Sequence, residues 1–390
     1  MRDPRANRFL SRAMRRVRRE RPRIPPHEKW YTRVETVPSG RYVEIWFTTA
    51  GCRWDASGGC TMCNYGRGSA LSPQETVAAV GEALRDTQPL RASELMISPS
   101  GSMLDSHEVA PAARAGIYSL VRTTSARRFF VETRAETVTA AAADELCQAV
   151  PDKELVLEIG LESADPWVQR FCVNKRAGPE DFRAAMAIAH GRGMRLYANV
   201  ALGLPFLSAR ETIADAIASA RWALDAGADM VDLFAIHVKP FTLTALLFDH
   251  SAYQPPSLWS LVEVLRQLGP TLVPRIELSW YKSYLPAESG LVLSSPSTCP
   301  RCVDRVMKSL DDYRATQDWQ VVRALSEFDC DCRAAWRRDV EATPVEPLSD
   351  RVLRAYAGIG RQLDMSWGPD ERSALLAAMK RTPAARPIHT

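Results

Sequence analysis

Apolar runs of strand length alternate with alanine-rich amphipathic segments through the middle of the chain. Six of the apolar runs are rich in β-branched and aromatic residues, as buried strands are. They are YVEIWFTT, ELMIS, RRFFVET, ELVLEIGL, RLYANVALGL and DMVDLFAI, which together span about residues 42–235. A helix is expected after each of the first five, beginning near Ser72, Glu108, Thr139, Pro179 and Ser208.

The helix near Ser208 has the clearest start signal, because Ser208 and Glu211 have the spacing of a capping box. Strands joined by helices of this length pair in parallel, since each connection must cross over to return to the same end of the sheet. The pattern therefore predicts an α/β fold, either a full or partial barrel or a doubly wound sheet. In each of these folds, functional side chains lie at the carboxyl ends of the strands.

The length and composition are those of a globular protein, since 390 residues with 46% hydrophobic content can bury a sizeable core. No stretch reaches the roughly 18 uncharged apolar residues of a membrane span, and the charged N-terminus lacks the apolar segment of a secretory signal. We therefore expect a cytoplasmic protein with no membrane partner. In a reducing compartment, nine mostly clustered cysteines fit metal ligands better than disulfides.

Positive charge is concentrated at the N-terminus. Residues 1–23 hold ten arginines against Asp3 and Glu20, so this arm carries +8 while the rest of the chain, from a total of +4, carries −4. Such an arm either binds phosphates of a nucleic acid or is a solvated, partly helical extension. PRIPP, residues 22–26, is expected to end it. We therefore predict a basic extension over 1–26, a barrel core over 27–250, and a C-terminal region with a metal site and a helical tail over 251–390.

Three cysteines lie on the loop after the first predicted strand. GCRWDASGGCTMCNYG, residues 51–66, has the spacing C-x7-C-x2-C, with thiols at Cys52, Cys60 and Cys63. Three thiolates cannot complete a tetrahedral zinc shell without a fourth protein ligand, whereas a cubane iron–sulfur cluster on three cysteines leaves one iron open. The glycines at 51, 58 and 59 allow the loop unusual backbone angles. The alternative is a group of buried thiols in a glycine-rich turn.

With these motifs the chain resembles the radical S-adenosylmethionine (SAM) enzymes, whose usual signature is C-x3-C-x2-C after the first strand of a partial (β/α)6 TIM-like barrel. The longer spacing found here, together with GGCTMCNYG, SPSGSMLD and GLES, resembles the archaeosine synthase radical SAM subunit and, more distantly, the catalytic subunit of Elongator. The resemblance covers about half of the chain. It implies a partial (β/α)6 barrel, which the N-terminal extension precedes along the chain and the C-terminal region follows.

The resemblance also implies roles for individual residues. Cys52, Cys60 and Cys63 would hold a [4Fe-4S] cluster, whose fourth iron binds the amino and carboxylate groups of SAM. Further SAM contacts would come from Met62 near the adenine, Gly101 and Ser102 at the methionine moiety, Glu132 and Arg134 at the amino and carboxylate groups, and Glu162 and Ser163 near the ribose. The residues expected to face the substrate are Asn199, His237 and Lys239. The alternatives are an internal salt-bridge network for the charged residues and a satisfied core position for the histidine.

The implied reaction is reductive cleavage of SAM to methionine and a 5′-deoxyadenosyl radical, which abstracts hydrogen from an unactivated carbon. We expect a small polar metabolite or a nucleoside- or amino acid-derived substrate, with C–N bond cleavage suggested by the archaeosine relative and a lyase or transferase type left open. An electron donor such as flavodoxin or ferredoxin is implied. The alternatives are a radical SAM enzyme that modifies tRNA with the help of the arginine arm, and a non-catalytic metal-containing protein that binds nucleic acid.

A second cysteine group lies downstream, where a C-x2-C pair is followed after 27 residues by a C-x-C pair. This spacing is typical of a four-cysteine metal site. Four thiolates suit a structural zinc ion or an auxiliary [4Fe-4S] cluster, and we favour zinc because four ligands leave no open position. The predicted ligands are Cys299, Cys302, Cys330 and Cys332.

Overall fold

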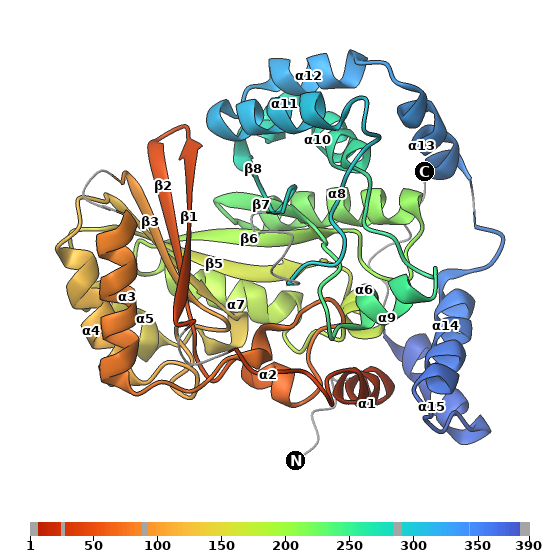
Figure 1. Cartoon of the computed structure of the whole chain (residues 1–390), viewed down its shortest axis with the longest axis horizontal. Coiled ribbons are helices and arrows are strands. Elements are labelled where there is room, and N and C mark those ends of the chain that lie inside the picture. Colours follow the sequence, from red (N-terminus) through yellow and green to blue (C-terminus); the bar gives the residue numbers. More distant parts are fainter. Residues whose placement is uncertain (1–6, 25–27, 88–91, 284–290, 343, 383–390) are drawn as a thin grey trace.

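The computed structural model describes residues 7–24, 28–87, 92–283, 291–342 and 344–382, and its centre is one sheet of eight strands in sequential order (Figure 1). β1 pairs with β2 in antiparallel fashion, and all the other neighbours are parallel. The sheet curls into an open half-barrel. The strands are β1 (Trp30–Val37), β2 (Gly40–Phe47), β3 (Glu94–Pro99), β4 (Arg128–Thr133), β5 (Glu154–Glu162), β6 (Arg195–Leu202), β7 (Met230–Ala235) and β8 (Ile276–Ser279).

The predicted partial barrel is confirmed, and its six predicted strands correspond to β2 through β7. Two strands were not predicted. β1 alternates exposed and buried positions and carries charged residues, because it covers the edge of β2 rather than the centre of the sheet. β8 has only four residues and follows directly on a short 3₁₀ turn, so its apolar run is too brief to stand out.

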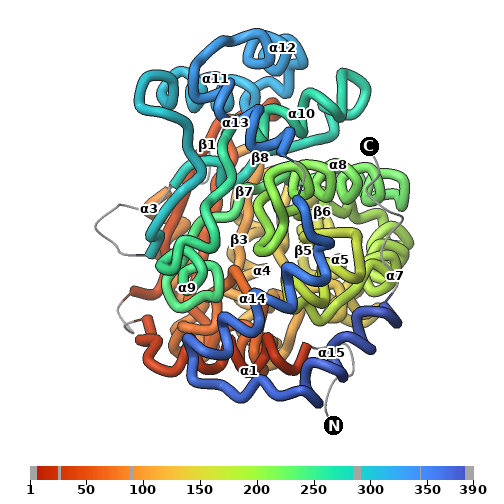
Figure 2. Tube along the Cα trace, turned by 90° about the vertical axis from the view of Figure 1, so that its right-hand side faces the viewer, coloured from red at the N-terminus to blue at the C-terminus, as the bar shows by residue number. Residues whose placement is uncertain are grey.

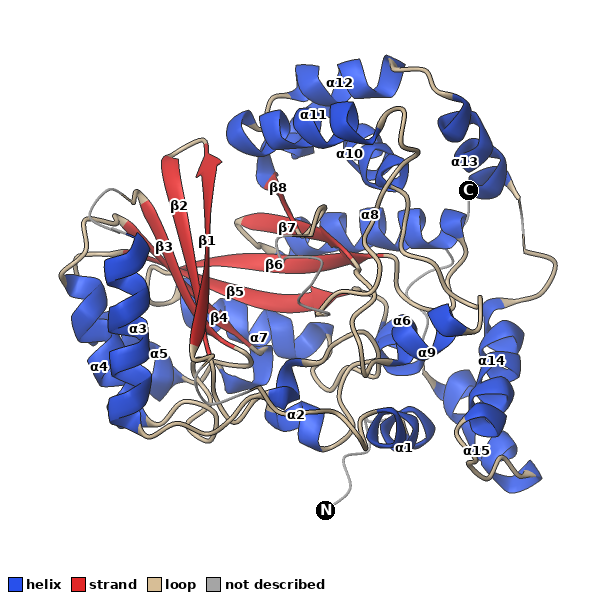
Figure 3. Cartoon of the chain, viewed as in Figure 1, coloured by secondary structure: helices blue, strands red, loops and turns tan. Residues whose placement is uncertain are grey.

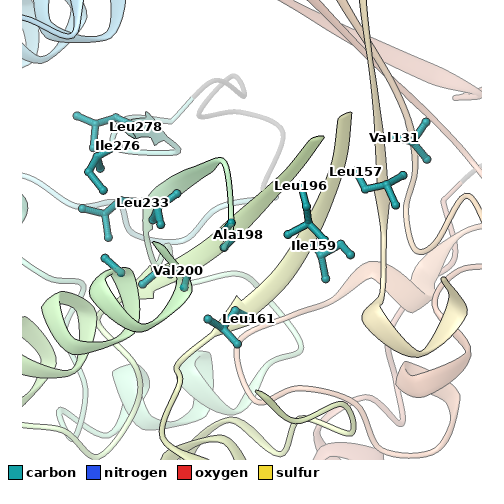
Figure 4. Packing of buried hydrophobic residues seen from close by; sticks show 14 of the residues in the cluster. Val131, Leu157, Ile159, Leu161, Leu196, Ala198, Val200, Leu233, Ile276 and Leu278 are labelled. Atoms are coloured by element: carbon teal, nitrogen blue, oxygen red, sulfur yellow. The ribbon is translucent and has the colours of Figure 1, made fainter. Parts of the chain in front are cut away.

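Helices cover the outer face of the half-barrel (Figure 3). Each predicted helix begins within three residues of its expected start, and the Ser208–Glu211 capping box of α8 is present. Apolar side chains of the strands pack beneath these helices as a continuous core, part of which Figure 4 shows. The helices are α3 (Pro73–Thr87), α4 (Pro111–Arg122), α5 (Ala140–Ala149), α7 (Pro179–His190) and α8 (Ala209–Ala226).

The N-terminal arm packs on the body of the protein as α1 (Arg8–Val17), beside α14 (Leu348–Gln362) and α15 (Pro369–Arg381) (Figures 1 and 2). Phe9 and Leu10 of α1 are buried, and the Phe9 ring stacks on Tyr356 of α14 with 4.7 Å between ring centroids. The alternative of a partly helical extension is thus right about the helix and wrong about solvation, because one face of α1 is buried. The arginines of α1 are separated by apolar residues at helical spacing, and this apolar face supplies the contact.

The C-terminal region adds a layer of helices near β8: α10 (Leu258–Leu272), α11 (Val303–Thr316), α12 (Trp319–Glu327) and α13 (Asp331–Glu341). Among the helices of the described residues, none combines the length and the apolar character that crossing a bilayer requires. The shorter elements are α2 (Arg53–Ala56), α6 (Pro166–Val168), α9 (Leu243–Asp249), η1 (Tyr65–Arg67), η3 (Ala135–Thr137), η4 (Gln169–Val173) and η5 (Val273–Arg275).

Candidate functional site

The three-cysteine loop follows β2 and contains α2. Its glycines have the positive φ angles that were predicted, with +91° at Gly51, +135° at Gly58 and +70° at Gly59. The backbone N–H of Asp55 donates to the Cys52 sulfur, and the N–H of Tyr65 donates to the Cys63 sulfur. These bonds orient two of the three thiols before any metal is bound.

The three sulfurs lie near one another without touching. Burial raises the pKa of Cys52 to about 11, and repulsion from the Cys63 thiolate adds to this shift. Burial also raises the pKa of Cys60, with contributions from Cys63 and Cys52. Among the described residues, only the C-terminal cysteines gather as closely as the ligands of a single ion.

Arg134 lies at the edge of this loop. Its Nη1 atom is 3.3 Å from the Cys52 sulfur, and its guanidinium binds Glu108 at 2.5 Å and Asp105 at 2.7 Å. Glu108 also accepts from the backbone N–H of Ser102 at 2.6 Å. Asp105 and Glu108 were not predicted, although the serine- and glycine-rich motif after β3 contains Asp105 and ends close to Glu108.

Gly101 was predicted to permit a close approach, and its surroundings have no room for a side chain. A Cβ atom there would lie 2.2 Å from Glu108 Oε2 and 3.4 Å from Cys52 Cα. The loop after β3 is thus fitted directly against the first cysteine. Ser102 joins the same network, because its hydroxyl accepts a hydrogen bond from the Arg134 backbone N–H at 2.9 Å.

A cavity of about 160 Å³ lies next to Met62 and Cys63 and extends along the inner face of the sheet. We call this cavity the chamber. Aromatic rings of Trp46, Tyr65 and Trp280 form part of its wall. The carboxylates that line it come from five strands: Glu44, Glu132, Glu158, Glu162, Asp232 and Glu277.

Burial makes several of these carboxyl groups hard to ionise. Desolvation raises the pKa of Glu132 to about 7, that of Glu277 to about 7, and that of Glu44 to about 8. The pKa of Glu158 is raised further above its usual value by burial and by repulsion from Asp232. The chamber therefore holds more carboxyl groups than its own cations neutralise.

The cationic side chains of the chamber lie close to aromatic rings and carboxylates. Arg33 forms an ion pair with Glu44 and lies 5.4 Å from the Trp46 ring centroid. Lys239 lies 5.0 Å from the centroid of Tyr65, and burial lowers its pKa, against the attraction of Cys63 and Glu132. An ammonium group thus stands between the cysteine loop and the acidic wall.

Seven of the predicted site residues line this chamber: Met62, Cys63, Glu132, Glu162, Asn199, His237 and Lys239. His237 is also a satisfied buried histidine: its ring nitrogens lie 3.0 Å from Ser295 Oγ and 2.6 Å from the Trp280 carbonyl oxygen. Burial lowers its pKa to about 4, so the ring is neutral at physiological pH.

Glu162 and Ser163, which were both predicted to lie near the ribose of SAM, have surroundings that differ from each other. Glu162 has a φ of +58° and pairs with Lys175 at 2.5 Å. Ser163 is fully buried and donates to Asp215 at 2.7 Å, so it does not line the chamber. The change of backbone direction at Glu162 accounts for the difference, because the strand register shifts there.

The four C-terminal cysteines converge as predicted. Neighbouring sulfurs are 3.5 or 3.6 Å apart, and all four lie within 4.8 Å of one another. The Trp259 indole N–H of α10 donates to Cys332 Sγ at 3.3 Å. The prediction of a four-cysteine group that can bind metal is confirmed.

No family model matches the chain. The chain is 31% identical to archaeosine synthase subunit beta of Methanosarcina acetivorans over 302 residues, which cover 76% of this chain and 84% of that protein. The protein of the same name from Thermococcus kodakarensis is 29% identical over 321 residues, covering 77% and 92% of the two chains. The crystal structure of methylornithine synthase aligns with 95% of this chain and 90% of its own, with 12% identity and a TM-score of 0.47. From the similarity to the Methanosarcina protein, in a chain with a cysteine loop at the first strand of a half-barrel, we conclude that this protein belongs to the archaeosine synthase subunit beta family of radical SAM enzymes.

Proposed function

We propose that Cys52, Cys60 and Cys63 hold a [4Fe-4S] cluster with SAM beside it, and that the enzyme acts on a substrate with a positively charged amino group in the chamber. When bound, the cluster and SAM supply one-electron chemistry that can break an unactivated C–H bond. The chain contributes binding, orientation and exclusion of water around the reacting carbon. The observation that carries the choice of substrate is a group of unpaired acceptors deep in the chamber.

Three buried oxygens of the chamber have no N–H or hydroxyl donor among the described residues: Glu158 Oε2, Asn199 Oδ1 and Asp232 Oδ1. The Glu158 and Asp232 carboxyl groups can bond to each other only when one of them holds a proton. Asn199 of β6 pairs directly with Asp232 of β7, and Gly160, two residues after Glu158, pairs with Asn199. The three residues therefore occupy neighbouring positions on three adjacent strands. Leaving such atoms unpaired is costly, and a ligand that donates to them recovers the cost.

An ammonium group matches these acceptors in number and in charge. It presents three N–H donors, and the three oxygens belong to two carboxyl groups and one amide. Glu158 and Asp232 interact closely enough to share a proton, which a bound cation would displace. An amino acid-derived substrate with a side-chain amino group, such as the lysine type, fits this chemistry.

The residues nearest the cysteine loop are proposed to bind SAM. Glu132 and Lys239 line the chamber beside Cys63 and offer an acceptor and a donor for the amino and carboxylate groups. Gly101 and Ser102 lie against Cys52, where backbone groups can approach the methionine moiety. Arg134 already forms ion pairs with three carboxylates. We therefore propose that its main role is to orient Cys52, in addition to any contact with SAM.

The amino-group proposal predicts a binding difference between two ligands of similar shape. L-lysine is expected to raise the melting temperature of the protein in the presence of SAM, whereas L-norleucine, which lacks the terminal ammonium, is expected to raise it less. The Asp232→Asn variant should bind lysine at least about tenfold more weakly, because a hydrogen bond to a charged group contributes about 1.5–3 kcal/mol.

The matched control is Asp215→Asn, which changes a buried carboxyl group outside the chamber lining. This variant should keep the difference between lysine and norleucine. Equal stabilisation by both ligands, or an unchanged lysine affinity in Asp232→Asn, would show that the chamber does not select a side-chain ammonium group.

We further propose that the four C-terminal cysteines bind one zinc ion. A tetrahedral site with zinc–sulfur bonds of about 2.3 Å has sulfurs about 3.8 Å apart. The separations of 3.5 and 3.6 Å are close to this value, which supports a single ion. An auxiliary cluster would place each sulfur on a different iron and hold them farther apart.

A second candidate function is modification of tRNA bound along α1, as the name of the archaeosine synthase relatives suggests. Arg12, Arg15, Arg16 and Arg19 line a surface depression beside Asp364. If tRNA binds there, the double variant Arg16→Gln, Arg19→Gln should bind it more weakly and with a shallower salt dependence. An unchanged tRNA affinity would leave the small-molecule substrate as the supported function.

A further inference from the structure

Arg18, the residue after α1, reaches into the three-cysteine loop. Its side chain is only 6% exposed, and its guanidinium donates to four backbone carbonyl oxygens: Asp55 at 3.3 Å, Gly58 at 2.6 Å, Cys60 at 3.1 Å and Cys63 at 2.5 Å. It also pairs with Asp55 Oδ1 at 3.0 Å. One buried cation thus connects both ends of the segment that carries the second and third cysteines.

Gly58 and Gly59 leave the space beside the loop that the arm occupies. A Cβ atom on Gly59 would lie 2.4 Å from Arg18 Nη1, and a Cβ atom on Gly58 would lie 2.7 Å from Ser11 Cα of α1. The glycine pair therefore serves two needs, since both residues have positive φ angles and both leave room for the arm. The arm and the loop are fitted to each other at the level of the backbone.

Asp55 is a second link between arm and loop. It is 4% exposed and is held by Arg18 and by Arg21, whose Nη2 atom lies 2.6 Å from Asp55 Oδ2. Arg21 also donates to the Gly66 carbonyl oxygen at 2.8 Å. Asp55 belongs to α2, within the seven residues between Cys52 and Cys60. The long first spacing of the cysteine motif thus supplies the anchor for the arm.

We propose that Arg18 is a positioning residue for the iron–sulfur cluster, acting through the carbonyl groups of the loop and through its buried positive charge. The inference rests on the proposed function, because it requires the cluster on Cys52, Cys60 and Cys63. Fixed carbonyl groups hold the backbone of the two later ligands in place. A buried cation behind the ligands favours the added electron, so it makes reduction of the cluster easier.

The test compares Arg18→Gln, Arg18→Lys and the control Arg16→Gln in full-length protein after anaerobic reconstitution. Arg16 carries the same charge in the same helix, but it donates to the Leu363 and Asp364 carbonyl oxygens on the other side of the arm. Two quantities are measured: the midpoint potential of the cluster by electron paramagnetic resonance, and the rate of iron loss to a chelator.

Arg18→Gln is expected to shift the midpoint potential to a more negative value and to lose iron about tenfold faster, the range for residues that orient metal ligands. Arg18→Lys should keep a potential near that of the parent but still lose iron faster, because one ammonium group cannot replace the guanidinium at four carbonyl oxygens. Arg16→Gln should match the parent in both measurements.

A folded Arg18→Gln protein with the potential and iron loss of the parent would overturn the inference. If Arg18→Gln does not fold, Arg18→Lys decides the positioning role, and an unchanged rate of iron loss in that variant would overturn it. A parent protein that takes up no cluster would overturn the proposed function, and the inference with it.

Discussion

Replacing Cys302 with serine is expected to remove the zinc ion that we propose for the C-terminal cysteines and to lower the free energy of unfolding by more than about 4 kcal/mol, the range reached when a metal site is lost. Cys302 is 2% exposed and caps the start of α11. Cys330 caps the start of α13, so the metal joins two helices that the sequence places 27 residues apart. Zinc content by mass spectrometry and denaturant unfolding give the two readouts.

The control for this experiment is Cys147→Ser, because Cys147 is a partly buried cysteine on α5 that belongs to neither cysteine group. This control should keep one zinc ion per chain. Full zinc content in Cys302→Ser, or iron and sulfide in place of zinc in the parent, would contradict the proposal.

Loss of the zinc ion should also affect the chamber. Arg314 lies on α11, lines the chamber and pairs with Glu35 of β1 at 2.7 Å. Tyr313, its neighbour on α11, donates to the Ile276 carbonyl oxygen of β8 at 2.8 Å. α11 thus begins at Cys302, a proposed zinc ligand, and ends at the barrel wall. The C-terminal region therefore completes the chamber.

Replacing Glu158 with glutamine is expected to stabilise the cofactor-free protein, and to do so more at pH 8 than at pH 5. Burial and repulsion from Asp232 raise the folded-state pKa of Glu158 well above 4.5, so the native state holds a proton that the unfolded chain releases. The parent therefore loses stability as the pH rises from about 4.5 toward the folded-state pKa, whereas glutamine has no such dependence. The difference should grow by up to about 1.4 kcal/mol per pH unit.

Denaturant unfolding of variant and parent at several pH values between 5 and 8 measures this difference. Glu180→Gln, at an exposed position of α7, is the control and should show a nearly constant difference. A constant difference for Glu158→Gln would mean that this carboxyl group is not strained in the fold. The same substitution removes a proposed carboxylate acceptor for the substrate amino group. A variant that is more stable than the parent but binds the substrate more weakly would therefore identify Glu158 as a functional residue.

The arrangement of the core follows from the sequence to a large extent. Alternation of apolar runs and helices identifies β2 through β7, and a capping box gives the start of α8. β1 is missed because an edge strand with one exposed face has no continuous apolar run. The C-terminal cysteine group is predictable because each of its two pairs has the spacing of metal ligands, and the fold brings the two pairs together.

Contacts between distant segments are what the sequence does not reveal. The ten arginines of the arm are equivalent in a charge count, yet Arg18 is buried on the cysteine loop while Arg19 is exposed. Deleting residues 1–23 would therefore remove both the loop contacts and the exposed charges. Point variants on the exposed side of α1 are needed to separate nucleic-acid binding from support of the loop.

The central claim is that the three-cysteine loop supports radical SAM chemistry. Its most direct test is the amount of 5′-deoxyadenosine formed after anaerobic reconstitution with iron and sulfide and reduction with SAM present. The parent should form it, and the variant with Cys52, Cys60 and Cys63 all replaced by alanine should not. Absence of 5′-deoxyadenosine from a reconstituted parent that holds its cluster, or equal amounts from the triple variant, would contradict the account.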